Sequence, residues 1–194
     1  VTTKGISQDT SNLLGNFLLE DAYEDEPFAL IVALEKLFRE EPRPEYLTAL
    51  ADCALNIGLR ERDPDVSIRF FLSAALFSYT YLALLDQPDL KPYNAERLTM
   101  MRIYNLAIAE IFDYLDERDL ELKFSFTLNA AGGQRLTFLP PRFELPLKPQ
   151  SFSKFLLCAD FRTKNLTHVG RRFGIGAPLI CCLTEAAIDT GDSE

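Results

Sequence analysis

The residues of this chain that could carry out chemistry are few, and their spacing matches no self-contained catalytic site. His168 is the only histidine in 194 residues. No serine lies in a G-x-S-x-G elbow and no cysteine has a plausible partner base, so a Ser-His-Asp or Cys-His site would depend on His168 alone. We therefore interpret His168 as a solvated loop side chain, and we rank an independent enzyme last among the functions considered.

A glycine-rich loop near the carboxyl end is the second chemical feature. Two glycines after an arginine pair could hold an anion between backbone N–H groups and guanidinium groups; the residues concerned are Arg171, Arg172, Gly174 and Gly176. A dinucleotide fingerprint also needs a third glycine and an immediate helix start, which Ala177-Pro178 prevents. We favour a flexible loop that turns the chain into a strand, with anion binding or contact with another domain as the alternatives.

The cysteines predict neither a metal site nor a disulfide scaffold. They lack C-x-x-C spacing and a companion histidine cluster, and they are Cys53, Cys158, Cys181 and Cys182. We expect buried free thiols, no bound metal and no cofactor. Cys181 and Cys182 should not bridge each other, because adjacent residues of a strand point to opposite faces.

Composition and charge narrow the classes of partner. With 47% hydrophobic and 25% charged residues, the chain is typical of a folded globular protein. The formal net charge of −9 is concentrated in residues 1–120, which hold 22 acidic and 11 basic residues. Because such a portion repels phosphate backbones, we expect no nucleic-acid partner. The start at Val1 shows no signal-like pattern, so it does not predict a localisation.

No transmembrane span is predicted. The longest dense apolar run, Phe70 to Leu85, is interrupted by hydroxyl side chains. It therefore falls short of the ~18 uninterrupted apolar residues that a membrane helix needs.

Four patterns with helical period fill the first two thirds of the chain. Pro27, Pro44 and Asp63-Pro64 each predict a helix start, because proline in a first turn removes only an N–H that has no partner there. We expect Gly58 to end the second helix and Asn94 to cap the fourth. The third, expected to be the longest, should bury Phe70, Phe71, Ala74, Phe77, Ser78, Tyr81 and Leu85. The fourth should present an apolar face of Leu98, Met101, Tyr104, Ile108, Ile111, Phe112 and Leu115.

After Arg118 the apolar period changes from that of a helix to that of a strand. Leu122 to Leu128 and Arg135 to Phe138 are predicted to pair as an antiparallel hairpin around Asn129-Ala-Ala-Gly-Gly. The residues that this hairpin should bury, wholly or in part, are Phe124, Phe126, Leu136 and Phe138.

Three further segments follow the hairpin. A third alternating run, from Phe143 to Leu147, contains Pro146 and should be an edge strand. Ser151 to Phe161 returns to helical spacing, and the short apolar run Leu179 to Leu183 suits a buried strand.

These patterns predict an α+β fold, in which an antiparallel helical bundle leads into a small antiparallel β-sheet. We place a helical domain in residues 1–120. Residues 121–194 are assigned to a β-hairpin and small-sheet region, whose Gly-rich loop leads towards a further domain. Tetratricopeptide units recur every 34 residues, and no second copy of the Pro64 helix pattern follows, so an irregular bundle is favoured over a repeat array.

Short motifs along the chain resemble the amino-terminal region of a group of poorly characterised bacterial envelope proteins. The motifs are A-A-x-x-S-Y-x-Y-L at Ala74–Leu82, R-x-Y-N-x-A at Arg102–Ala107, and F-G-I-G-A-P-L at Phe173–Leu179, with a hairpin between the last two. In those proteins such a region precedes an α/β-hydrolase-type domain, often behind a lipoprotein signal. The resemblance implies an accessory domain, a periplasmic or envelope-anchored location, and no catalytic residue here, because the nucleophile elbow and lipidated cysteine are absent from these residues.

Two function classes remain open from the sequence. In the first, the chain is a non-catalytic cap or docking domain of a lipase- or esterase-like α/β-hydrolase, and its partner is a hydrolase domain downstream in the same chain. In the second, it is a stand-alone helical interaction module whose groove binds a protein or peptide. A G-x-S-x-G motif beyond Glu194 would favour the first class, and a stop codon there would favour the second.

Overall fold

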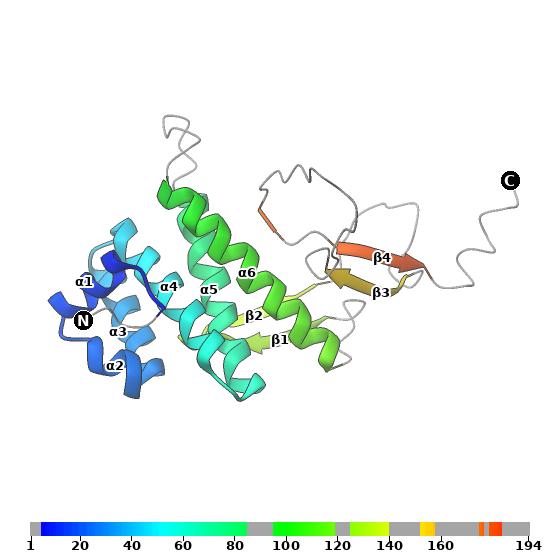
Figure 1. Ribbon diagram of the computed structural model, residues 1–194, viewed down its shortest axis with the longest axis horizontal. Coiled ribbons are helices and arrows are strands. Elements are labelled where there is room, and N and C mark those ends of the chain that lie inside the picture. The colour runs from blue at the N-terminus through cyan, green and yellow to red at the C-terminus, as the bar shows by residue number, and fades with distance from the viewer. Residues whose placement is uncertain are drawn as a thin grey trace, which may run out of the picture.

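The computed structural model describes residues 5–84, 95–118, 125–139, 152–157, 175–176 and 179–183, and it confirms the α+β class (Figure 1). The helices in these ranges are α1 (Gln8–Asn16), α2 (Glu20–Asp25), α3 (Pro27–Glu40), α4 (Pro44–Arg60), α5 (Pro64–Leu84) and α6 (Ala95–Glu117). The strands form two antiparallel pairs, β1 (Phe126–Asn129) with β2 (Arg135–Phe138) and β3 (Phe152–Leu157) with β4 (Leu179–Leu183).

The three predicted proline starts are confirmed. Pro27, Pro44 and Pro64 are the first residues of α3, α4 and α5. At the last of these, the Asp63 carboxylate accepts a hydrogen bond from the Asp65 N–H at 2.9 Å, which satisfies one of the unpaired donors of the first turn. The predicted cap of the fourth helix, Asn94, lies outside the described residues. Within the described residues that helix, α6, has 23 residues and α5 has 21. Because the described range ends at the last residue of α5, the prediction that α5 is the longest helix stays a prediction.

The prediction that Gly58 ends the second helix is wrong, because α4 continues to Arg60. Gly58 is buried within the last turns of the helix. A Cβ atom at this position would lie 2.8 Å from Cε1 of Phe71 on α5. The glycine therefore serves close packing of two helices rather than helix termination.

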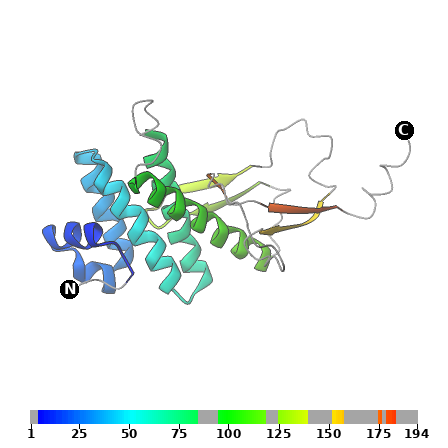
Figure 2. The same ribbon diagram turned by 45° about the horizontal axis from the view of Figure 1, so that its top comes forward.

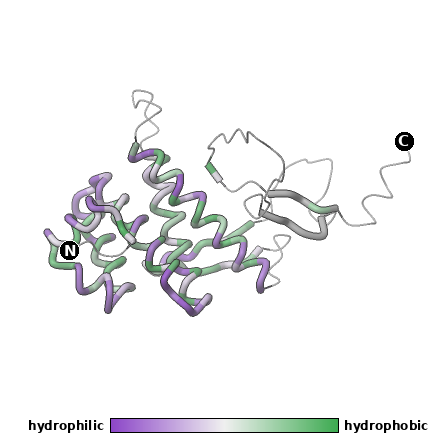
Figure 3. Tube along the Cα trace, in the orientation of Figure 1, coloured by the Kyte–Doolittle hydropathy of each residue, from purple (hydrophilic) through white to green (hydrophobic). Residues whose placement is uncertain are grey.

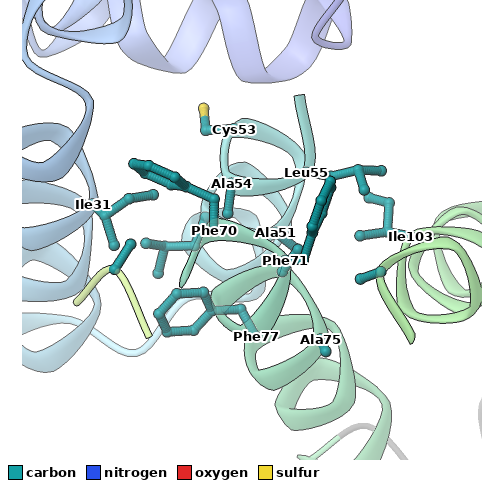
Figure 4. Close-up of a cluster of buried hydrophobic side chains, with 14 of the residues drawn as sticks. Ile31, Ala51, Cys53, Ala54, Leu55, Phe70, Phe71, Ala75, Phe77 and Ile103 are labelled. Carbon is teal, nitrogen blue, oxygen red and sulfur yellow. The ribbon is translucent and has the colours of Figure 1, made fainter. Parts of the chain in front are cut away.

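Helix α5 is the central element of the core, with α4 and α6 beside it (Figure 1, Figure 2). Phe70 and Phe71 leave α5 on opposite sides, Phe70 toward Ile31 of α3 and Phe71 toward Ile103 of α6 (Figure 4). Phe70 is fully buried, and its ring lies 4.7 Å from that of Phe28, centroid to centroid. Aromatic pairs at this distance add to the stabilisation that burial alone gives.

The apolar composition of α5 raises a separate question. Residues Pro64–Ala83 are long and apolar enough to cross a membrane by length and composition alone, with a mean hydropathy of 1.3 (Figure 3). However, 67% of that stretch is buried among other elements of the fold, as in the central helix of a packed core. The absence of a membrane span stays a prediction.

Helix α6 buries a face that overlaps the predicted one only in part. Its buried residues are Met100, Ile103, Ala107, Ile111 and Leu115. Ile111 and Leu115 belong to both the predicted and the buried face. Leu98, which was expected to face inward, is 38% exposed. The remaining residues of the predicted face are half-buried: Met101, Tyr104, Ile108 and Phe112. Two apolar stripes run side by side on this helix. Helix α6 packs against α5, and its more deeply buried stripe contains the small residue Ala107.

The β1–β2 hairpin packs directly on the helices. Its strands pair in antiparallel register from Phe126 with Phe138 to Asn129 with Arg135, as predicted for these residues, while Leu122 to Phe124 lie outside the described ranges. Phe126 and Phe138 are half-buried, and their rings stack with a centroid separation of 4.8 Å. Ala131 of the connecting loop is 5% exposed within the helical core. The division of the chain at residue 120 stays a prediction.

Backbone and side-chain hydrogen bonds hold the connecting loop of this hairpin. The Ala131 N–H donates to the carbonyl oxygen of Arg69 and to Oγ of Ser73, both at 2.9 Å and both on α5. Gln134 Nε2 donates to Glu35 Oε1 of α3 at 2.7 Å. The loop is thereby fixed to two helices at once.

The helical spacing over Ser151 to Phe161 is misleading, and the prediction of a helix there is wrong. Phe152–Leu157 is strand β3, which pairs antiparallel with β4, with an irregularity between Phe152 and Lys154. A short apolar run does not fix its own secondary structure by period, and pairing with another strand supplies its backbone with partners. The predicted strand Leu179 to Leu183 is confirmed as β4. The run Phe143 to Leu147 lies outside the described residues.

Candidate functional site

The predicted glycine-rich loop is described at one of its four residues. The N–H of Gly176 donates to Asn105 Oδ1 of α6 at 2.7 Å, and Gly176 has a φ of +110°, a conformation that favours glycine. Arg171, Arg172 and Gly174 lie outside the described residues, as does His168. Binding of an anion by this loop stays a prediction, whereas its contact with α6 is a structural fact.

The structure describes the surroundings of two of the four thiols, those of Cys53 and Cys182. Cys53 is fully buried, and burial raises the pKa of its thiol well above the ordinary value. Cys182 on β4 is half-buried, although the sequence predicted a buried thiol. Within the described ranges no three or more histidine, cysteine, aspartate or glutamate residues are placed to hold a metal ion. The absence of a metal from the whole protein stays a prediction.

The candidate binding site of the described residues is a groove of about 910 Å³. It is lined by α1 and by the first turns of α4 and α6, three elements that are far apart in the chain. The lining residues are Ser7, Asp9, Thr10, Asn12, Leu13, Asn16, Phe17, Arg43, Glu45, Tyr46, Thr48, Ala95, Glu96 and Thr99. Volumes of about 300–1,000 Å³ are typical of ligand-binding sites.

One wall of the groove is fixed by Asp52, a carboxylate of α4 that is only 8% exposed. Asp52 Oδ2 accepts hydrogen bonds from the Ser7 N–H and from Oγ1 of Thr10, both at 2.8 Å. Its Oδ1 accepts from Asn56 Nδ2 at 2.9 Å. Ser7 in turn caps α1, because its hydroxyl oxygen accepts from the Thr10 N–H. The start of α1 is therefore held to α4 by a buried, charge-assisted network.

An aromatic corner closes one end of this wall. Phe17 follows α1, and its ring meets that of Tyr46 edge to face, with centroids 6.0 Å apart and an interplanar angle of 67°. Tyr46 is 6% exposed, whereas Phe17 is 42% exposed. The corner thus presents an apolar ring to the groove while its partner ring is anchored in the fold.

Three carboxylates line the groove, and each belongs to the first turn of a different helix. They are Asp9 of α1, Glu45 of α4 and Glu96 of α6. Helix N-termini stabilise negative charge, which offsets the cost of placing three acids near one another. The one basic residue in the lining, Arg43, forms an ion pair with Glu41. The groove is therefore acidic.

Glu96 also connects the groove to the core through hydrogen bonds. It accepts a hydrogen bond from Oγ1 of Thr48 at 3.1 Å and is hydrogen-bonded to the buried hydroxyl of Tyr81. Burial raises the pKa of Tyr81 above its ordinary value, and the hydrogen bond and negative charge of Glu96 raise it further. Tyr81 is therefore a hydrogen-bond donor to this carboxylate at neutral pH, and the carboxylate is held in place.

The groove provides acceptors, hydroxyls and an aromatic ring, which are side chains that suit the binding of a ligand. This site could not be predicted from the sequence, because its residues come from positions 7–17, 43–48 and 95–99 and meet only in the folded chain. The acids in the first turns of several helices were a usable signal, although such acids stabilise helices in most proteins.

Comparisons with protein-family models, with curated proteins and with solved structures find no match for this chain. The site is therefore interpreted from its own geometry.

Proposed function

We propose that this chain is a helical binding module that holds a peptide segment of a partner protein in the groove between α1, α4 and α6. The observation that carries this proposal is the groove itself, a concavity of about 910 Å³ built from three helices. Helical folds commonly recognise partners through grooves between their helices.

The construction of the groove supports this function. A binding site is effective when its side chains are held in place before the ligand arrives, because less conformational freedom is then lost on binding. The Asp52 network fixes the α1 wall, and the contacts of Thr48 and Tyr81 fix Glu96. Phe17 also exposes an aromatic ring, a type of side chain that is enriched at protein interfaces.

The proposal is tested by selection from a display library of random short peptides on the immobilised chain. The same selection is run on Thr99→Trp, which fills the groove from an exposed position of α6. Val32→Trp is the matched control, since Val32 is 56% exposed on α3 and does not line the groove. We expect peptides that bind the unmodified chain and Val32→Trp but not Thr99→Trp. A selection with no enrichment, or with enriched peptides that bind Thr99→Trp equally well, would contradict the proposal.

A role as an accessory domain of a hydrolase is a second proposal, which rests on the motif resemblance and on one contact. Gly176 of the F-G-I-G-A-P-L motif is bonded to Asn105 of the R-x-Y-N-x-A motif at 2.7 Å. Two of the motifs that carry the resemblance therefore touch. This contact would hold the loop, and any domain that it enters, against α6.

Three measurements test this second proposal. Residues 1–194 alone should neither hydrolyse short-chain nitrophenyl esters nor react with a fluorophosphonate probe. A longer natural protein that contains these residues should do both. Probe labelling of residues 1–194 that is abolished by His168→Ala would instead restore His168 as a catalytic base. Asn105→Leu, which removes the acceptor for the Gly176 N–H, should speed hydrogen exchange at Gly176, and an unchanged rate would show that the contact does not hold the loop.

A further inference from the structure

We infer that the segment bound in the groove is cationic, with an arginine or lysine side chain that lies across the Phe17 ring and points to the carboxylates of Glu45 and Glu96. This inference rests on the proposed function, because it names the chemistry of the ligand that the groove would take.

Charge is the first reason. The lining holds three carboxylates and one guanidinium, that of Arg43, which is already paired with Glu41 outside the lining. Arg97, next to Glu96 in the chain, does not line the groove, but its charge lowers the pKa of Tyr81. Each helix N-terminus carries only about half a positive charge, so three termini offset about half of the three carboxylates. Negative charge therefore remains at the groove. The excess of acidic over basic residues in positions 1–120, 22 against 11, adds to the negative potential at longer range. A cation is attracted and an acidic segment is repelled.

The aromatic corner is the second reason. An arginine or lysine side chain needs an apolar surface for its aliphatic stem and acceptors for its head group. Phe17, which is 42% exposed, supplies a ring against which a guanidinium or the stem can lie. The same arrangement already occurs within this fold, where the guanidinium of Arg60 lies 4.2 Å from the centre of the Tyr23 ring.

The acceptors are the third reason. Glu45 has an exposed side chain, so its two oxygens can receive the fork of an arginine. Glu96 accepts from Thr48 and is bonded to Tyr81, and a carboxylate has about four acceptor positions. These internal bonds orient Glu96, so a bound cation would not have to order it.

The test uses NMR titration of the chain with N-acetyl-arginine N-methylamide, and in parallel with the citrulline analogue. Citrulline has nearly the same shape but no charge, so a difference between the two reports the charge alone. We expect the arginine compound to shift the resonances of Phe17, Glu45 and Glu96 and to bind more tightly than the citrulline compound. Equal binding of the two, or shifts that avoid these residues, would overturn the inference.

Substitutions then locate the interaction. Glu45→Gln should weaken binding of the arginine compound about two- to fivefold, the range for partly exposed charge pairs, and added salt should weaken it too. Glu117→Gln, at an exposed acid of α6 away from the groove, should change nothing. Phe17→Leu should weaken arginine binding while the chain stays folded. Equal effects of Glu45→Gln and Glu117→Gln would show that only the overall charge matters, and this result would contradict the inference.

The outcome separates the two proposals. If peptide selection gives groove-dependent binders that lack arginine and lysine, the binding function stands and the cationic inference fails. If selection gives no groove-dependent binder, the proposed function fails. If the arginine compound also shows no shifts at the groove, the inference fails as well.

Discussion

Gln134 and Glu35 form a hydrogen bond of 2.7 Å between Nε2 and Oε1, which joins the β1–β2 hairpin to α3 across 99 positions of the chain. Glu35 is 6% exposed and also accepts from Nη2 of Arg39 at 2.8 Å. Buried carboxylates need such partners, because an unpaired buried charge is costly. The hydrogen bonds from Gln134 and Arg39 therefore explain how Glu35 can lie on an otherwise apolar face of α3.

The first prediction concerns the glycine beside this pair. A Cβ atom at Gly132 would overlap Oε1 of Glu35, so Gly132→Ala must displace the carboxylate from Gln134. We expect a loss of about 1–3 kcal/mol in the free energy of unfolding, the cost of leaving a buried polar group without its partner. Urea unfolding measures it. In a Glu35→Ala background the same change should cost clearly less, and equal costs in both backgrounds would rule out this explanation.

A second prediction concerns Gly58 of α4. Alanine usually stabilises a helix relative to glycine by about 1 kcal/mol. Here the added methyl group would meet the Phe71 ring at 2.8 Å, so overpacking should win and Gly58→Ala should destabilise the chain by about 1–3 kcal/mol. Gly15→Ala in α1 is the control, since its new Cβ would find only an ordinary contact of 3.4 Å. Thermal unfolding should show shifts in melting temperature that differ in sign or in size between Gly58→Ala and Gly15→Ala. A stabilised Gly58→Ala variant would contradict the packing described.

Gly58 also shows where sequence-based prediction succeeds and where it stops. The prolines at positions 27, 44 and 64 predicted three helix starts correctly, because the constraint on proline is local. The end at Gly58 was predicted wrongly, because the reason for that glycine is Phe71, on another helix. The same holds for β3, whose partner β4 lies more than 20 residues away in the chain, and for the groove, whose three walls meet only in the folded protein.

A third prediction links the fold to the groove. Asp52→Ala removes the acceptor of the Ser7 N–H, of Thr10 Oγ1 and of Asn56 Nδ2. We expect a destabilisation of about 1–3 kcal/mol, and faster hydrogen exchange at the amides of α1, because that helix loses its attachment to α4. Asp25→Ala, at an exposed acid of α2, is the control. If exchange in α1 were the same in both variants, Asp52 would not be what holds this wall of the groove.

A fourth prediction concerns pH. Hydrogen bonds from the Tyr114 hydroxyl and from Arg118 lower the pKa of Asp65 below its ordinary value. A carboxyl group with a lower pKa in the folded state adds stability above its unfolded pKa of about 3.9, and this stability is lost as the pH falls through the folded value. NMR titration should show the Asp65 pKa rising toward the ordinary value in Tyr114→Phe. An unchanged pKa in that variant would exclude the tyrosine hydroxyl as a cause.

The central claim, that the groove between α1, α4 and α6 holds a peptide, is tested most directly by calorimetric titration of a selected peptide into three proteins. These are the unmodified chain, Thr99→Trp with the groove filled, and Val32→Trp with the same bulky change outside it. The account predicts equal dissociation constants for the unmodified chain and Val32→Trp, and at least about a tenfold weaker one for Thr99→Trp, which corresponds to a loss of about 1.4 kcal/mol. Equal dissociation constants for all three proteins would show that the peptide binds elsewhere and would contradict the claim.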